Sequence, residues 1–148
     1  MATMYSKILV ATDGSEQNHQ AVLEAIGLAK SEKAELHCLY IVDTIAFASL
    51  PMDVTWENVY NVLYQEGKEA IELVKKQAKK EGVKFFSSVL EGNPAVEIVK
   101  YAQENGADLI VVGTLGRGGL SRFLLGSTAE KVIRTAPCPV MVVRQPEE

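Results

Sequence analysis

The chain has 148 residues, of which 47% are hydrophobic and 23% charged, and its formal net charge is −4. These values are ordinary for a globular domain, and we expect one domain over residues 1–148. An acidic chain without a basic block predicts no nucleic-acid binding, and no apolar run approaches the roughly 20 residues that span a bilayer. The N-terminal residues show no signal-peptide pattern, so we expect a cytoplasmic protein.

Short apolar runs alternate with helical patterns along the chain. Strands are expected near residues 7–11, 35–42, 83–89, 109–112 and 140–143. Apolar residues at helical spacing predict a helix in each of the four intervals between these strands. The alternation predicts one doubly wound, Rossmann-like α/β domain with a five-stranded parallel sheet and helices on both faces. We expect the strand order 3-2-1-4-5, which makes the first and fourth strands neighbours.

Polar residues and glycines mark the expected ends of several helices. Ser15 and Asn93 are predicted N-caps, because each precedes a helical pattern and carries a side-chain acceptor. Gly82 and Gly106 are predicted to end the helices that they follow. Residues 44–55 show no clear period and include several apolar residues, so we expect this segment to form a mobile surface.

The first predicted strand is followed by a polar turn, residues 12–15, which we call the Asp13 turn. The Asp13 carboxylate can accept hydrogen bonds from ribose hydroxyls or help to hold a metal ion on phosphates. Its alternative role is to cap the first helix or to form an Asx turn. We favour ligand contact for Thr12 and Asp13, because ligands bind where the strand order reverses. Backbone groups near Ile41 are expected to read the adenine edge.

A glycine-rich connection, residues 113–128, follows the fourth predicted strand. Twelve residues separate Gly113 from Gly126, whereas such a connection usually takes about two to six. Glycine allows close approach to a ligand, and a helix that begins at Ser127 offers N–H groups to an anion. We predict a phosphate-binding loop that uses the amides from Gly116 to Gly126 and the hydroxyls of Ser127 and Thr128. The alternative is a surface turn followed by an ordinary serine cap.

Arg117 and Arg122 belong to this loop, where each either contacts phosphates or is solvated. The loop is not a Walker A motif, because Gly126 is followed by Ser127 and not by lysine. It also does not fit the dinucleotide pattern G-x-G-x-x-G. No catalytic arrangement is found, since the G-x-S-x-G elbow is absent and His19 is expected to face solvent. No residue spacing predicts a metal site made by protein ligands alone.

The spacing of this loop, G-x2-G-x9-G-[S/T], resembles the ATP-binding signature of the universal stress protein family. Residues 7–15 resemble the family's opening strand and turn, and residues 39–43 and 137–143 are similar to its second and closing strands. Leu115 departs from the pattern, because many family members carry histidine there. The resemblance implies ATP at the switch point, with Mg²⁺ or Mn²⁺ on its phosphates. The contacts it implies come from Asp13, Ile41, Gly113, Gly116, Gly126, Ser127 and Thr128.

The resemblance also implies a homodimer in which the last strands, Val140 to Val143, pair with each other. The sequence supports this pairing independently, because an apolar edge strand needs cover. We expect an ATP-binding stress-response or signalling module with little or no intrinsic hydrolysis. The alternatives are a slow metal-dependent ATPase or phosphotransferase that uses the same loop, and a nucleotide-independent dimeric scaffold.

Overall fold

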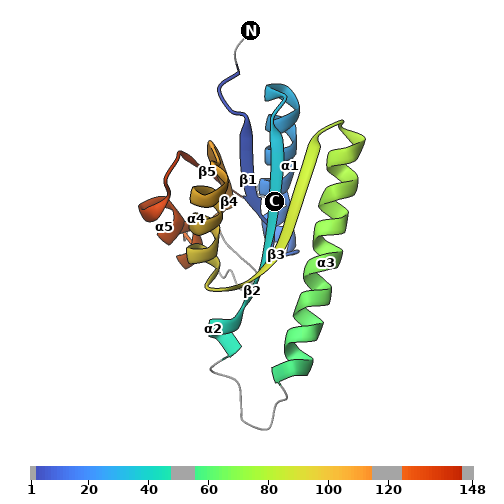
Figure 1. Ribbon diagram of the computed structural model, residues 1–148, viewed down its shortest axis with the longest axis vertical. Helices are drawn as coiled ribbons and strands as arrows, with labels where there is room; N and C mark the ends of the chain where they lie inside the picture. Colours follow the sequence, from blue (N-terminus) through green and yellow to red (C-terminus); the bar gives the residue numbers. More distant parts are fainter. Residues whose placement is uncertain (1–2, 48–55, 115–124, 145–148) are drawn as a thin grey trace.

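The computed structural model describes residues 3–47, 56–114 and 125–144. Its strands form one parallel sheet in the order β3-β2-β1-β4-β5 (Figure 1). The strands are β1 (Lys7–Ala11), β2 (Glu35–Asp43), β3 (Lys84–Gly92), β4 (Leu109–Gly113) and β5 (Val140–Val143). The predicted strand order and the doubly wound fold are therefore confirmed.

Helices cover both faces of the sheet (Figure 1). They are α1 (Glu16–Glu32), α2 (Thr44–Phe47), α3 (Trp56–Lys80), α4 (Pro94–Asn105) and α5 (Ser127–Thr135). In β1, Ile8 and Val10 pack into a core cluster with α1 and α3, whereas Leu9 packs into a second cluster with α4 and α5. All three side chains are fully buried. The continuous apolar run of β1 thus reflects a strand that is covered on both faces.

The predicted helix ends are largely confirmed by the cap geometry. The Ser15 side chain accepts a hydrogen bond from Asn18 N–H, and Asn93 caps α4 in the same way. Gly106 ends α4 in the left-handed region, with φ 66°. The C-cap residue of helix α1 is instead Lys33, which adopts the left-handed conformation with φ 56°. No glycine marks that end in the sequence.

The segment expected to be mobile is regular in part. Helix α2 follows β2 directly, although residues 44–47 show no helical period in the sequence. A helix of four residues is too short for its apolar spacing to show a period. The remainder of the expected segment, residues 48–55, lies outside the described residues.

Helix α3 packs against β2 at a glycine. Gly67 is buried, and a Cβ added there would lie 2.5 Å from Cδ1 of Tyr40. The Tyr40 side chain belongs to the core cluster and is only 4% exposed. The missing side chain at Gly67 therefore lets the Tyr40 ring lie directly against the helix backbone.

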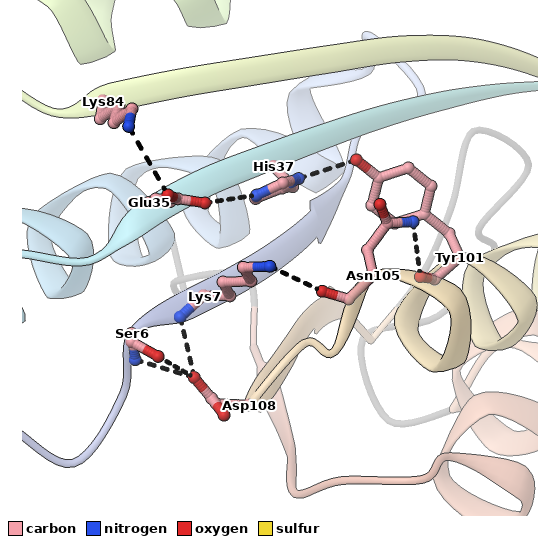
Figure 2. A network of polar contacts seen from close by, with 8 residues as sticks. All are labelled: Ser6, Lys7, Glu35, His37, Lys84, Tyr101, Asn105 and Asp108. Carbon is pink, nitrogen blue, oxygen red and sulfur yellow. Dashed lines mark hydrogen bonds and ion pairs between the residues drawn. The ribbon is translucent and has the colours of Figure 1, made fainter.

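A polar network joins the elements at the amino-terminal edge of the sheet (Figure 2). Asp108 Oδ2 accepts hydrogen bonds from Ser6 N–H at 2.9 Å, from the Ser6 hydroxyl at 2.7 Å and from Lys7 N–H at 2.9 Å. The Lys7 ammonium donates to the Asn105 carbonyl at 3.0 Å. The start of β1 is thereby tied to the end of α4 and the start of β4.

His37 connects β2 to α4 near the same edge (Figure 2). Its Nδ1 lies 2.7 Å from the Tyr101 hydroxyl and its Nε2 lies 3.1 Å from Glu35 Oε1. The hydrogen bond with His37 holds the pKa of Glu35 below its usual value, and burial raises the pKa of Tyr101. His37 also stacks on Phe86, with ring centroids 4.8 Å apart. These contacts give His37 a structural role.

We expect Asp108→Asn to weaken the fold at pH 7 by about 1 kcal/mol, because it weakens charge-assisted hydrogen bonds. The hydroxyl and N–H of Ser6 hold the pKa of Asp108 below its usual value. Such a carboxyl stabilises the fold above its unfolded pKa of about 4, and this contribution is lost as the pH falls through the folded pKa. In urea unfolding from pH 7 to 3, the difference between the free energies of unfolding of the wild type and Asp108→Asn should shrink as the pH falls below about 4. A difference that is independent of pH would contradict this role.

Candidate functional site

The ends of β1 and β4 meet at the carboxyl edge of the sheet. The register pairs Val10 with Val111, so continuing it by two residues places Thr12 level with Gly113. The strand order reverses between β1 and β4, which is where ligands bind in open α/β sheets. The Asp13 turn and the start of the glycine-rich connection therefore lie side by side, as predicted.

Hydrogen bonds within the Asp13 turn fix its shape. Ser15 N–H and the Ser15 hydroxyl both donate to Asp13 Oδ1, at 2.9 Å and 2.5 Å. Gly14 has φ 77°, and its N–H donates to Thr12 Oγ1 at 3.2 Å. The N–H of Thr12 donates in turn to the Leu39 carbonyl at 2.8 Å. The Asx turn considered for Asp13 is present, and it holds the carboxylate at the edge of the sheet.

The N-terminus of α5 is anchored at the end of β4. Gly126 is its N-cap residue and donates its N–H to the Thr114 carbonyl at 2.6 Å. The Gly126 carbonyl accepts from Glu130 N–H at 3.0 Å, which begins the helical pattern. The N–H groups of Ser127, Thr128 and Ala129 have no carbonyl within α5 to accept from them. The donors that α5 offers to an anion thus begin at Ser127, whereas the amide of Gly126 is bonded to Thr114.

Ile41 brings β2 to the same edge, because β2 is the other neighbour of β1. The side chain of Ile41 is partly buried in the core cluster with α4 and α5. Ile41 therefore lies on the face of the sheet that α5 covers. The strand order places Ile41 and the Asp13 turn along one edge, and the bond from Gly126 N–H to the Thr114 carbonyl brings the start of α5 to the same edge.

Two predicted site residues fall in a part of the chain that carries no structural description. Gly116 and Arg117 lie in residues 115–124, outside the described residues, as do Leu115 and Arg122. Their contacts with phosphates stay predictions that rest on the sequence. Ser127 and Thr128 are described, and they occupy the first two positions of α5.

Asn18 is a residue near this edge that the sequence did not single out. It is 7% exposed, and its Nδ2 donates to the carbonyl of Ala11, the last residue of β1, at 3.1 Å. Among the described residues, its Oδ1 is a buried acceptor without a hydrogen-bond partner. Such an acceptor costs about 1–3 kcal/mol unless a donor reaches it. The signal in the sequence was an asparagine on the apolar stripe of a helix, three residues after the cap.

A groove of about 680 Å³ opens on the other side of the Asp13 turn, between α1 and α3. Thr12, Ser15 and the exposed side chain of His19 line it from one side, and α3 residues such as Leu73 line it from the other. The groove reaches the turn from the face opposite to Ile41 and α5. We place the candidate site between β1 and β4, because the strand order reverses there.

Other chemical groups in the described parts of the chain do not form a second centre. No group of three or more His, Cys, Asp and Glu residues there is arranged to hold a metal ion. Cys38 and Cys138 are free thiols, and burial raises the pKa of Cys38 to about 12. Within the same ranges, no helix is long and apolar enough to cross a membrane.

A parallel sheet that winds in both directions from β1, with polar loops at its switch point, defines a doubly wound, Rossmann-like α/β protein. Within this class, the model of the universal stress protein family matches residues 4–144. The chain belongs to the universal stress protein family, as its glycine spacing and flanking strands predicted.

Individual relatives agree with this assignment. The chain is 48% identical over 145 residues to universal stress protein MJ0531 of Methanocaldococcus jannaschii, an alignment that covers 98% of this chain and 85% of the relative. The solved structure of protein MJ0577 superposes with a TM-score of 0.81 at 32% identity, covering 99% of this chain and 100% of that one. A universal stress protein solved in complex with cAMP superposes with a TM-score of 0.74 at 26% identity, covering 97% and 100% of the two chains.

Proposed function

We propose that this protein binds ATP at the edge between β1 and β4 and acts as a nucleotide-dependent stress-response or signalling module. The observation that carries this proposal is that the Asp13 turn lies beside the end of β4, to which the N-terminus of α5 is bonded through Gly126 and Thr114. The cAMP complex of a family member supports an adenine nucleotide as the ligand.

The phosphates are proposed to lie at the N-terminus of α5. The N–H groups that begin at Ser127 have no partner within the helix, and the helix dipole favours an anion there. The hydroxyls of Ser127 and Thr128 add two further donors close by. Gly116, Arg117 and the rest of the loop are proposed to complete these contacts, on the strength of the glycine spacing.

The nucleoside is proposed to lie across the ends of β1 and β2. Asp13 carries a carboxylate that accepts from ribose hydroxyls, and Thr12 holds the turn from which it projects. Ile41 supplies apolar contact and backbone groups for the adenine ring. Gly113, at the end of β4, allows the ligand to approach the backbone between the two halves of the site.

The donor set fits a metal ion that is bound mainly by the nucleotide. Asp13 is the only carboxylate among the proposed site residues, so the phosphates themselves would supply most other ligands to Mg²⁺ or Mn²⁺. Mg²⁺ commonly binds in this way, through one or two carboxylates together with substrate phosphates. When bound, the ion would neutralise phosphate charge, while Asp13 and Ser127 would hold the nucleotide in place.

We propose that ATP serves as a conformational ligand and that hydrolysis is slow or absent. A bound nucleotide shifts the protein only toward a conformation for which it has higher affinity. Efficient phosphoryl transfer requires an oriented nucleophile besides phosphate binding, and the sequence offers no candidate base. A slow metal-dependent ATPase or phosphotransferase is the alternative within the same site.

Measurements of ATP turnover and of ATP affinity distinguish a protein that uses ATP as a conformational ligand from a slow ATPase. We expect less than about one turnover per hour in Mg²⁺ or Mn²⁺, below the median enzyme rate of about 10 s⁻¹ by more than four orders of magnitude. Asp13→Asn and Ser127→Ala should both weaken ATP binding in calorimetry. Metal-dependent turnover that either variant abolishes while its ATP affinity is retained would favour the ATPase.

We propose that two copies pair through β5, as the family resemblance implies. β5 is an edge of the sheet, and all four of its residues are apolar and only half-buried. Pairing of this edge with the same edge of a second copy would cover the exposed backbone groups of β5.

Mass spectrometry of ligand released from gently purified protein tests the nucleotide proposal. The absence of any adenine nucleotide would favour the nucleotide-independent scaffold.

A further inference from the structure

We propose that Ser15 is a positioning residue for the nucleotide, because its hydroxyl orients the Asp13 carboxylate. This inference rests on the proposed function, in which Asp13 contacts the ligand. The sequence predicted Ser15 only as the N-cap of a helix. In the structure its hydroxyl accepts from Asn18 N–H as that cap, and it also donates to the Asp13 carboxylate.

The Ser15 hydroxyl takes part in two hydrogen bonds of unequal geometry. It donates its single hydrogen to Asp13 Oδ1 at 2.5 Å, within the range of about 2.5–2.7 Å for a hydroxyl bonded to a carboxylate. It accepts from Asn18 N–H at 3.3 Å, which exceeds the usual N–H···O range of about 2.7–3.2 Å. The stronger of the two bonds is therefore the one to Asp13.

A second donor from the same residue fixes the direction of the carboxylate. Ser15 N–H donates to Asp13 Oδ1 at 2.9 Å, so both donors converge on one oxygen. With Oδ1 held at two points, the position of Oδ2 relative to the end of β1 is set as well. A side chain that is ordered before binding loses less entropy when the ligand arrives.

Ser15 is itself held against the sheet by Asn18. Asn18 N–H is shared between the hydroxyl and the carbonyl of Ser15, each at 3.3 Å, and Asn18 Nδ2 donates to the Ala11 carbonyl at 3.1 Å. Ala11 is the last residue of β1. A chain of hydrogen bonds thus runs from the end of β1 through Asn18 and Ser15 to the Asp13 carboxylate.

Three substitutions separate orientation of Asp13 from capping of α1. Ser15→Thr keeps a hydroxyl for both bonds. Ser15→Asn keeps a good N-cap acceptor but removes the hydroxyl, and Ser15→Ala removes both. We expect Ser15→Thr to bind ATP within about twofold of wild type, and Ser15→Asn and Ser15→Ala to bind about three- to tenfold more weakly. In urea unfolding, only Ser15→Ala should show a clearly lower midpoint.

A matched control removes a cap elsewhere. Asn93 caps α4 by accepting from Val96 N–H at 3.2 Å, and α4 follows the edge strand β3. Asn93→Ala should lower the unfolding midpoint as Ser15→Ala does, yet leave the ATP affinity unchanged. This result would show that loss of a helix cap alone does not weaken binding.

Calorimetry with MgATP on the full chain decides the proposal. Wild-type affinity in Ser15→Asn, with weaker binding only in Ser15→Ala, would assign Ser15 to the cap and overturn the positioning role. Wild-type affinity in all three variants would overturn it too, while the proposed function would stand. Failure of the wild-type protein to bind ATP would overturn both proposals together.

Discussion

Gly67→Ala is expected to destabilise the fold by about 2 kcal/mol, even though alanine favours helices by about 1 kcal/mol over glycine. The new Cβ would lie 2.5 Å from Cδ1 and 2.9 Å from Cε1 of the buried Tyr40 ring. Because Tyr40 is almost fully enclosed between α3 and the sheet, its ring cannot move aside without disturbing the core. The midpoint of thermal unfolding should fall by roughly 4–8 °C in calorimetry.

Gly27 provides the matched control, since it also lies inside a helix. A Cβ added at Gly27 would meet no atom within 4 Å beyond its neighbours in the chain and the backbone of its own helix. Gly27→Ala should therefore raise the stability by up to about 1 kcal/mol through helix propensity alone. If both alanine variants were equally stabilised, the close packing of α3 on Tyr40 would be wrong.

Gly126→Leu is expected to weaken ATP binding by about 2 kcal/mol or more, roughly thirtyfold in Kd, with little change in the fold. The side chain of an N-cap residue lies over the first N–H groups of its helix. Leucine would cover the donors that begin at Ser127 without supplying an acceptor in exchange. The backbone of Gly126, at φ −65° and ψ 155°, accommodates any residue, so the substitution adds no backbone strain.

Gly126→Ser refines this prediction. Serine is a slightly better N-cap than glycine, by a few tenths of a kcal/mol, so α5 should be at least as stable as in wild type. Its hydroxyl would occupy the same N–H groups that we assign to the phosphates. We expect weaker ATP binding with an unchanged or higher unfolding midpoint. Unaltered ATP affinity in both Gly126 variants would remove the N-terminus of α5 from the site.

The positions of the strands and of the polar turns that follow them could be predicted because they depend on strong local signals. The runs at Ile8–Val10 and Leu109–Val112 are continuously apolar, as central strands covered on both faces must be. The order 3-2-1-4-5 is expected because it would bring Asp13 and Gly113 to one edge, and the strand pairing confirms this order. The caps at Ser15 and Asn93 are equally local, since each depends on contacts within three residues.

Features that depend on distant contacts could not be read from the sequence. Position 67 requires glycine because the Tyr40 ring, 27 residues away in sequence, packs against the helix there. The structural role of His37 depends on its hydrogen bond with Tyr101 of α4. The bond between Gly126 N–H and the Thr114 carbonyl joins the two ends of a long connection. The glycine spacing alone predicts that the amide of Gly126 binds phosphate. Because this amide is bonded to Thr114, it is removed from the predicted set of phosphate donors.

Titration of the wild-type protein with MgATP in a calorimeter tests the central claim most directly. We predict saturable binding with a dissociation constant below the millimolar range and one nucleotide for each chain. Adenosine, which lacks the phosphates that we place at α5, should bind at least about tenfold more weakly, a difference of about 1.4 kcal/mol. Absence of binding at millimolar ATP, or equal affinity for ATP and adenosine, would contradict a phosphate site between β1 and β4.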